Sequence, residues 1–447
     1  MSDDLIATVC GALDVPADGI AVTGRGSLPA AFRVTDLAVA SLAGAASALR
    51  ALLDDDDARL TVDRDLASHW FALSIRPDGW AIPPLWDAVA GDYATADGWI
   101  RLHTNAPHHR AAAVAVLDVA PERSAVAAAV ARRSAADLEE AVVAAGGAAA
   151  AMRSRTDWSA HPQGAAVAVE PLVDMRRTGT AMPLELPGVP MGRPLADVRV
   201  LDLTRVLAGP AATRLLAGWG AHVLRIDPPG WDEPGVIPEV LLGKRTARLD
   251  LRSAPGRSRF EDLLGEADVL VHGYRADALS GLGYDAVTRD AIRPGLVDVS
   301  LDAYGWTGPW ASRRGFDSLV QMSAGIAAEG MRALGRDRPT PLPVQALDHA
   351  TGYLVAAAVL RGLALRRDAL HGSRARLSLA RTAALLVDAG AQDASVPPSL
   401  ADPVVEPVVE RTSWGPARRV APPVSVVGAP LRWELPARAL GSDPASW

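Results

Sequence analysis

The chain of 447 residues has little cysteine, lysine and aromatic side chain. Its one cysteine, Cys10, excludes an intramolecular disulfide and a cysteine-based zinc cluster, and it fits a reducing compartment. Its one lysine is Lys244, and the arginines are scattered among acids at a net charge of -7. No basic face for nucleic acid is indicated, so we expect no nucleic-acid partner.

Export and membrane signals are also missing. The first residues, MSDDLIATVCGALDVPADG, are acidic and contain neither a basic segment nor a long apolar run, so we expect no secretory signal. Alanine-rich stretches such as 144–151 are too short and too small-sided to cross a bilayer. We expect a soluble, cytoplasmic protein with no membrane partner.

What is present is a regular alternation of strand and helix patterns in the second half of the chain. Strands are predicted at 198–203, 222–226, 246–251, 269–272 and 296–301, with helices at 211–219, 257–266 and 284–292. This alternation predicts a Rossmann-like, doubly wound α/β domain over 195–395, with ligands at the carboxyl ends of its strands. Neither GxGxxG nor GxxxxGK[ST] occurs, so the usual dinucleotide and P-loop signatures are absent.

The rest of the chain divides into segments that differ in composition and in apolar pattern. Residues 1–75 form a helix–strand segment, with a helix at 34–53 that ends before the acidic run 54–57 and a strand at 59–62. Residues 76–175 are expected to form a smaller α+β domain, with a strand at 99–103 and helices at 124–132 and 135–144. The Pro- and Gly-rich segment 176–194 is interpreted as a linker, and 396–447 as a C-terminal tail that packs on the large domain as short strands and loops.

Three histidines of the small domain, His103, His108 and His109, raise the question of a metal site. No carboxylate or thiol stands at ligand spacing beside them. Histidines at the surface or at a helix start are the favoured interpretation, and we expect no metal.

Asp348 stands where a Pro-flanked extended segment turns into an apolar, alanine-rich helix, LPVQALDHATGYLVAAAVLRGLALR at 342–366. An Asp in this setting is typical of a helix cap, so its side chain is expected to face the first backbone N–H groups of the helix. A functional role for this carboxylate depends on the blocks that precede it.

Five blocks in order carry a family resemblance. They are VRVLDLTRVLAGPAATRLLAGWGAHVLRIDPPG, GKRTARLDL, ADVLVHGYRADALSGLGYD, DAYGWTGPWASRRGFDSLVQMSAG and ALDHATGYLVAAAVLRGLALR. Over about 195–390 the chain closely resembles the family III CoA-transferases, the CaiB/BaiF group. The resemblance implies transfer of CoA from an acyl-CoA donor to a carboxylic acid acceptor, with Asp348 as the nucleophile that forms an aspartyl-CoA thioester. It implies no metal or redox cofactor, and we expect a homodimer.

The family's CoA-lining positions carry over to four residues. Val206 stands in the turn after the first strand of the α/β domain, Leu249 follows the Lys244–Arg245 pair, Tyr274 follows the third of the buried strands, and Arg314 precedes the Gly-Phe-Asp block. Each also has a plainer interpretation, because Val206 and Leu249 are typical of a core and a loop arginine is typically solvated.

The chain also departs from the family pattern. Pro228 and Gly281 occupy positions where some members have a basic residue, and the glycine-rich loop of the formyl-CoA transferase branch is missing, so the class of acceptor stays open. The DGWIRL segment, which resembles the family's small domain, precedes the α/β domain here. Residues 36–42 echo 348–354, and 59–62 echo 376–379, so 25–175 resembles a family second half. A duplication and a chance echo between alanine-rich helices both account for this repeat.

Two other functions remain open. The family includes 2-methylacyl-CoA racemases, isomerases that use an Asp/His pair, but the residue before the Asp of the Gly-X-Asp motif is Phe316 here instead of His. His349, as the immediate helix neighbour of Asp348, should point elsewhere. The second is a non-catalytic CoA-binding member whose rearranged halves no longer close a site.

Overall fold

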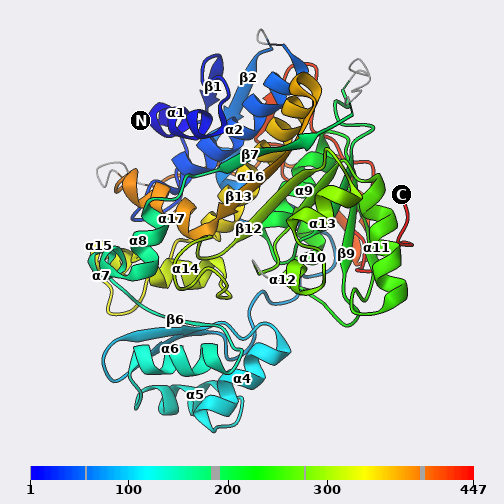
Figure 1. Ribbon diagram of the computed structural model, residues 1–447. Helices are drawn as coiled ribbons and strands as arrows, with labels where there is room; N and C mark the ends of the chain where they lie inside the picture. Colours follow the sequence, from blue (N-terminus) through cyan, green and yellow to red (C-terminus); the bar gives the residue numbers. More distant parts are fainter. Residues whose placement is uncertain (1, 56–57, 183–191, 276–277, 393–397) are drawn as a thin grey trace.

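A computed structural model describes residues 2–55, 58–182, 192–275, 278–392 and 398–447 of the chain. Its larger body is built on a seven-stranded sheet in the order β10-β9-β8-β11-β12-β13-β7 (Figure 1). The strands are β7 (Asp174–Thr180), β8 (Arg199–Leu203), β9 (His222–Asp227), β10 (Lys244–Arg248), β11 (Val269–His272), β12 (Val297–Asp302) and β13 (His371–Ser378). All neighbours pair in parallel except β13 and β7. The expected mixed α/β fold with a mostly parallel, doubly wound sheet is confirmed.

Helices cover both faces of this sheet, because its strands are apolar on both sides and must be buried on both. The helices of the larger body that follow β8 in the chain are α9 (Ala208–Gly218), α10 (Ile237–Val240), α11 (Ala254–Glu266), α12 (Ala278–Gly281), α13 (Ala286–Ile292), α14 (Asp317–Ser323), α15 (Ile326–Ala333), α16 (Ala346–Ala369) and α17 (Leu379–Asp388). Consecutive strands run outward in one direction from β8 to β10 and in the other from β11 to β13. The direction reverses between β8 and β11, where a doubly wound sheet opens a crevice for a ligand.

Helix α16 is the centre of the larger body. Its residues are buried on nearly every side, as expected for a helix that is apolar all round. It packs against α9, β13 and α2 (Val34–Leu53), whose bounds equal those predicted from the sequence. Asp54 ends α2 in a left-handed conformation, as the acidic run indicated. The echoing aspartates, Asp36 and Asp348, are each the third residue of their helix.

Strands from the N-terminal segment and from the C-terminal tail pair with one another. The N-terminal segment supplies α1 (Ser2–Leu13), β1 (Ile20–Thr23), β2 (Leu60–Asp63), α3 (Arg64–Trp70) and β3 (Ile75–Pro77), and the tail supplies β14 (Glu410–Thr412), β15 (Gly415–Arg419) and β16 (Val424–Val426). They form two small sheets, β1-β2-β16 and β14-β15-β3. The tail therefore packs as short strands and loops, with residues 431–436 in a loop.

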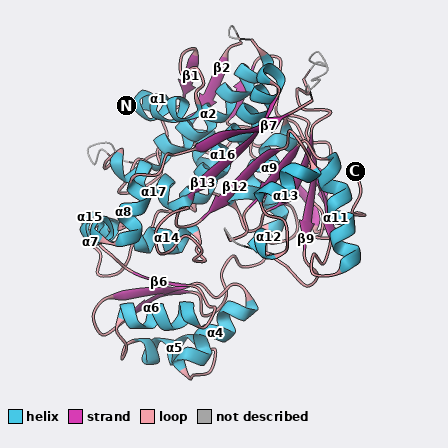
Figure 2. Ribbon diagram, in the orientation of Figure 1, coloured by secondary structure: helices cyan, strands magenta, loops and turns pink. Residues whose placement is uncertain are grey.

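The small domain lies below the larger body in the view of Figure 2 and forms a separate unit. It contains β4 (Gly91–Ala94), β5 (Trp99–Leu102), β6 (Ala149–Ala151), α4 (Pro107–Leu117), α5 (Arg123–Val130) and α6 (Ala135–Ala144). Its apolar core, centred on Ile100, Val130 and Leu138, is its own. The chain then returns to the larger body through α7 (Arg155–Ala160) and α8 (Pro162–Ala168), where the Gln163 amide donates to the carbonyls of Tyr304 and Thr307.

The interpretation of 176–194 as a linker was wrong for its first part. Residues 176–180 belong to β7, which pairs with β13 at the edge of the main sheet. Most side chains of β7 are exposed or half-buried, so the segment lacks the apolar alternation that predicts a strand. The remainder at 183–191 lies outside the described residues.

By length and composition, α2 could span a membrane, and it is the one such helix in the described part of the chain. Within its most apolar window 83% is buried inside the protein. It is a core helix that packs against α16.

Candidate active site

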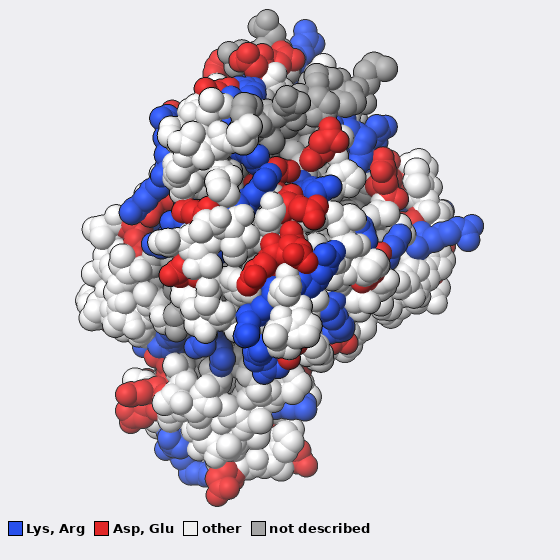
Figure 3. Space-filling model, turned by 45° about the vertical axis from the view of Figure 1, so that its right-hand side comes forward, with Lys and Arg blue, Asp and Glu red and all other residues white. Residues whose placement is uncertain are grey.

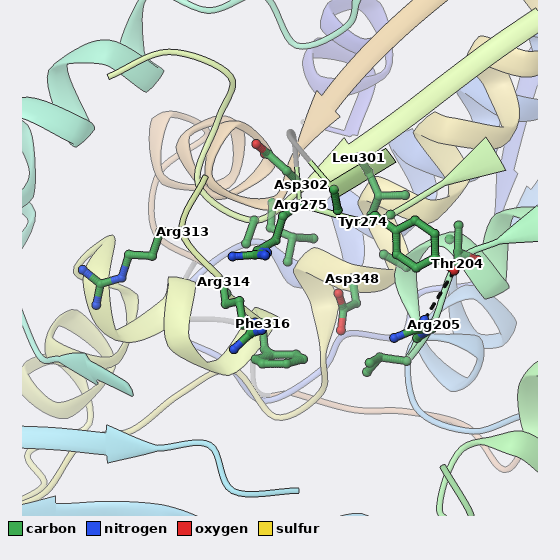
Figure 4. Close-up of a pocket in the computed structure, with 18 of the residues that line it drawn as sticks. Thr204, Arg205, Tyr274, Arg275, Leu301, Asp302, Arg313, Arg314, Phe316 and Asp348 are labelled. Carbon is green, nitrogen blue, oxygen red and sulfur yellow. Dashed lines mark hydrogen bonds between the residues drawn. The ribbon is translucent and has the colours of Figure 1, made fainter. Parts of the chain in front are cut away.

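A cavity of about 330 Å³ opens at the reversal point of the sheet. Its walls come from the segments that follow β8, β11 and β12, from the loop before α14, from the first turn of α16 and from the small domain (Figure 4). Its lining includes His108, His109, Thr204, Arg205, Val206, Ala208, Gly209, Trp231, Gly273, Tyr274, Arg275, Leu301, Asp302, Ala303, Arg313, Arg314, Gly315, Phe316, Asp348 and Leu379. The carboxyl ends of parallel strands thus meet the start of α16, where Asp348 stands.

The Asp348 side chain lines this cavity with 7% of its surface exposed, and no hydrogen bond from a described residue reaches its carboxylate. The N–H groups of the first turn are already occupied. Those of Leu347 and Asp348 donate to Asp317 Oδ2 at 2.8 and 3.0 Å, while those of Ala346 and His349 donate to backbone carbonyls. The expectation that Asp348 caps its own helix was therefore wrong, because the carboxylate of Asp317 fills that position.

The two carboxyl groups shape each other's ionisation. Burial raises the pKa of Asp317 to about 6, even though the amides of Asp348, Gln321 and Leu347 favour its ionised form. Burial and the charge of Asp317 raise the pKa of Asp348 well above its usual range. The backbone amides of the first turn donate to Asp317 and so do not stabilise the ionised form of Asp348. The carboxyl group of Asp348 is buried and stays available to the cavity.

The turn after β8 is strained and tightly held. Val206 has a φ of 62°, which is unusual for a β-branched residue. Its N–H donates to Glu233 at 2.7 Å, and Glu233 in turn pairs with the buried Arg225 at 2.8 Å. Such a conformation persists where the surroundings over-determine it, so the cavity wall at this turn is preorganised.

The guanidinium group of Arg205 lies between two aromatic rings. Its guanidinium carbon lies 4.4 Å from the ring centroid of Trp231 and 4.9 Å from that of Tyr274, whose hydroxyl accepts from Nη2 at 3.3 Å. No carboxylate among the described residues pairs with it, and its Nε is buried without a partner. This fixed, unneutralised cation favours an anionic ligand.

Further cations surround the opening of the cavity. Burial and the charge of Arg275 lower the pKa of Arg314, and burial with the charges of Arg314 and Arg205 lowers the pKa of His108. These groups therefore lie within electrostatic reach of one another. Figure 3 shows basic side chains gathered where the small domain meets the larger body. This cationic rim suits the phosphates of a nucleotide-like ligand.

The four residues expected to contact CoA lie in two places. Val206, Tyr274 and Arg314 line the cavity together with Asp348. Leu249 follows β10 and packs against the same apolar cluster as Tyr274, but it is not part of the cavity lining. The structure thus brings three of the four together, and CoA contact by all four stays a prediction.

Of the small-domain histidines, His108 and His109 stand in the first turn of α4, as expected, although His109 is buried. His103, which follows β5, is buried instead of exposed, and its ring stacks on Phe316 at 3.7 Å between centroids. His108 is exposed and lines the cavity. Across the described residues, no group of three His, Cys, Asp or Glu side chains could hold a metal ion.

Comparison with known proteins identifies the domain that contains this cavity. The model of CoA-transferase family III matches residues 195–418, half of the chain. The chain belongs to CoA-transferase family III. The match includes Asp348 and the parallel strands β8 to β13, whereas β7 lies before it.

Curated relatives of this CoA-transferase family member match over part of the chain. The acetyl-coenzyme A transferase nodX of Hypoxylon pulicicidum is 37% identical over 39% of this chain and 30% of its own length. The mouse succinyl-CoA:glutarate CoA-transferase is 34% identical over 39% of this chain and 42% of its own. The probable fatty acyl-CoA transferase Rv3272 of Mycobacterium tuberculosis is 32% identical over 38% and 46%. The matches thus span less than half the length of these relatives.

Solved structures of the same family align partially. A crystal structure of Rv3272 has a TM-score of 0.39 at 27% identity and covers 43% of this chain and 57% of that chain. A CAIB/BAIF family protein from Brucella suis also gives 0.39, at 25% identity over 50% and 65%.

Sequence reasoning missed several residues that the structure places at the site. Asp317 appeared only as part of a motif, and its contact with the first turn of α16 joins residues 31 positions apart. Arg205, Arg275 and His108 come from three separate segments of the chain. A signal for Arg205 existed, since it stands directly after a buried strand, at the end where ligands bind.

Proposed function

We propose that the protein is a CoA-transferase that moves CoA from an acyl-CoA donor to a carboxylic acid acceptor through an aspartyl-CoA thioester on Asp348. The observation that carries this proposal is the Asp348 carboxyl group, which projects into the cavity free of hydrogen bonds from the described chain. A nucleophile needs free lone pairs, whereas a carboxylate that only capped the helix would use its lone pairs to accept hydrogen bonds from the helix amides.

The proposed reaction balances without a metal. An oxygen of the ionised Asp348 attacks the thioester carbonyl carbon, the C–S bond breaks, and CoA leaves as a thiolate. The thiolate attacks the aspartyl carbonyl of the resulting anhydride, which releases the donor acid and leaves CoA on Asp348. The acceptor carboxylate then attacks this thioester, and the thiolate returns to the acceptor carbonyl to regenerate Asp348.

Three features of the cavity support these steps. The cationic rim of Arg205, Arg275 and Arg314 suits the phosphates of CoA. The strained turn at Val206 gives the wall a fixed shape. Burial leaves the ionised form of Asp348 poorly solvated, which makes that form of the carboxylate a stronger nucleophile.

The proposal is tested by trapping the covalent intermediate. The protein is incubated with acyl-CoA donors, treated with hydroxylamine or borohydride, and digested for peptide mass mapping. Label is expected on Asp348, and Asp348→Asn should show none and transfer no CoA. Asp36→Asn is the matched control, since Asp36 holds the same helix position outside the cavity. Label on Asp36, or on neither residue despite measurable transfer, would contradict the assignment.

A further inference from the structure

The cavity has two chemically distinct parts. The cations Arg205, Arg275 and Arg314 act on His108 and on one another, as the lowered pKa values of His108 and Arg314 show. None of them is among the groups that perturb Asp348, whose pKa is set by burial and by Asp317. Within the described chain no ion pair links Arg205, Arg275 or Arg314 to Asp348, although all four line the same cavity.

The wall shared with Asp348 carries apolar groups. Leu301 and Ala303 leave the end of β12, Leu379 begins α17, and Phe316 precedes α14, and each lines the cavity. Leu301, Ala303 and Leu379 are at least 90% buried. The backbone N–H of Ala380 donates to the Ala303 carbonyl at 2.9 Å, which fixes the start of α17 against this wall.

Asp302, between Leu301 and Ala303, is the other acid on this wall. Burial raises its pKa to about 8, so it is uncharged at neutral pH, and its Oδ2 is buried. Among the described residues no salt bridge reaches Asp348 or Asp302, although the charge of Arg376 favours the ionised form of Asp302. A second negative charge in this part of the cavity would be desolvated and unpaired, which is strongly unfavourable.

We propose that the acid exchanged at Asp348 carries an uncharged, apolar acyl chain, so that monocarboxylic substrates are preferred over dicarboxylic substrates of equal length. The inference rests on the proposed function, because the reacting carbonyl must reach Asp348 and the acyl chain must then lie against Leu301, Ala303, Leu379 and Phe316. Such an acyl chain lacks the second carboxylate of the succinyl group and of glutarate, which are named for the mouse relative.

The inference is tested by binding, independently of turnover. S-butyl-CoA and S-(3-carboxypropyl)-CoA are thioethers of equal chain length that Asp348 cannot cleave, and they differ by a terminal carboxylate. Titration calorimetry of the full chain should give at least about tenfold tighter binding of S-butyl-CoA, because the carboxylate would lie desolvated against the apolar wall of Leu301, Ala303 and Leu379. Equal affinity, or tighter binding of the carboxylated analogue, would overturn the inference.

A matched pair of variants locates the effect. Leu301→Lys places a cation on the apolar wall and should shift the affinity ratio at least about tenfold toward S-(3-carboxypropyl)-CoA, whereas Leu301→Met should leave it unchanged. Leu379→Lys is the second variant, in case Leu301→Lys does not fold. An unchanged ratio in a folded lysine variant would contradict the placement of the acyl chain.

The outcomes separate the two proposals. If S-butyl-CoA is preferred but no label appears on Asp348 during trapping, the transferase mechanism fails and the apolar acyl site stands. If Asp348 is labelled but the carboxylated analogue binds as tightly, the mechanism stands and the inference about the acyl chain fails.

Discussion

Asp317 accepts the backbone N–H of Asp348 at 3.0 Å through Oδ2 and thereby holds the first turn of α16 under the candidate nucleophile. Its other oxygen accepts from Gln321 at 2.5 Å. One acidic side chain caps the helix in place of another, and the negative charge it brings opposes the ionisation of Asp348.

Replacing Asp317 should shift the pH dependence of the site. Asp317→Asn keeps an acceptor for the helix amides but removes the negative charge, so the pKa of Asp348 should fall and labelling of Asp348 by acyl-CoA should begin at lower pH. The check is the rate of hydroxylamine-trapped label against pH. Asp285→Asn, at the exposed cap of α13, is the control and should leave the profile in place. A profile unmoved by Asp317→Asn would contradict this coupling.

Removing the charge of Asp348 should stabilise the protein at neutral pH. The folded-state pKa of Asp348 is raised above its ordinary value of 3.8, so the unfolded chain releases its proton first and stability falls as pH rises above about 4. Asp348→Asn should therefore gain about 1–3 kcal/mol in free energy of unfolding at pH 7, and nothing below about pH 4. Urea denaturation at both pH values is the measurement. A loss of stability at pH 7 would show that the buried carboxyl is satisfied.

Asp36 is expected to support structure and not turnover. Its carboxylate pairs with Arg33 at 2.7 Å and with Arg64 at 2.6 Å, which ties the start of α2 to α3. Asp36→Asn should cost about 1–3 kcal/mol of stability through these half-buried pairs while CoA transfer per folded molecule is retained. Chemical denaturation and a transfer assay on the same sample measure both. Transfer lost at unchanged stability would indicate a direct role for Asp36.

No exchange at the α-carbon is expected. Phe316, which stacks on His103, cannot transfer a proton, so a 2-methylacyl-CoA incubated in heavy water should gain no deuterium at its α-carbon. Mass spectrometry of the recovered ester measures this. Exchange on the turnover timescale would favour the racemase function, and its disappearance in His108→Ala would identify the base.

A buried ion network should make the protein sensitive to acid. Glu239 accepts from Ser74 and Ile75 and pairs with Arg214 and Arg419, and although burial opposes ionisation these charges lower its pKa to about 2. Its folded-state pKa is depressed, so the stability it contributes is complete above about 4.5 and is lost as pH falls toward about 2. Glu239→Gln should lower the free energy of unfolding by about 3–5 kcal/mol at pH 7, and the variant should lose less stability than the unmutated protein as pH falls from about 4.5 to about 2. Denaturation curves across pH, with the half-buried Glu329→Gln as control, provide the test.

The local sequence determined much of the fold. The apolar runs and their spacing located β8, β9, β11 and β12 to within one residue at either end, and the bounds of α2 and α6 were as predicted. Such elements are set by side-chain periodicity and by capping residues, which act over a few neighbouring positions. The position of Asp348 in the first turn of a buried helix was equally local, and so was predictable.

Tertiary structure decided which groups surround Asp348. The amides of its helix are taken by Asp317, β7 joins the sheet as an edge strand without an apolar pattern, and His103 of the small domain is buried against Phe316. Each contact joins segments far apart in the chain, and a carboxylate or imidazole carries no local mark of the partner it will meet. Its ionisation depends on burial and neighbouring charge, which exist only once the chain has folded.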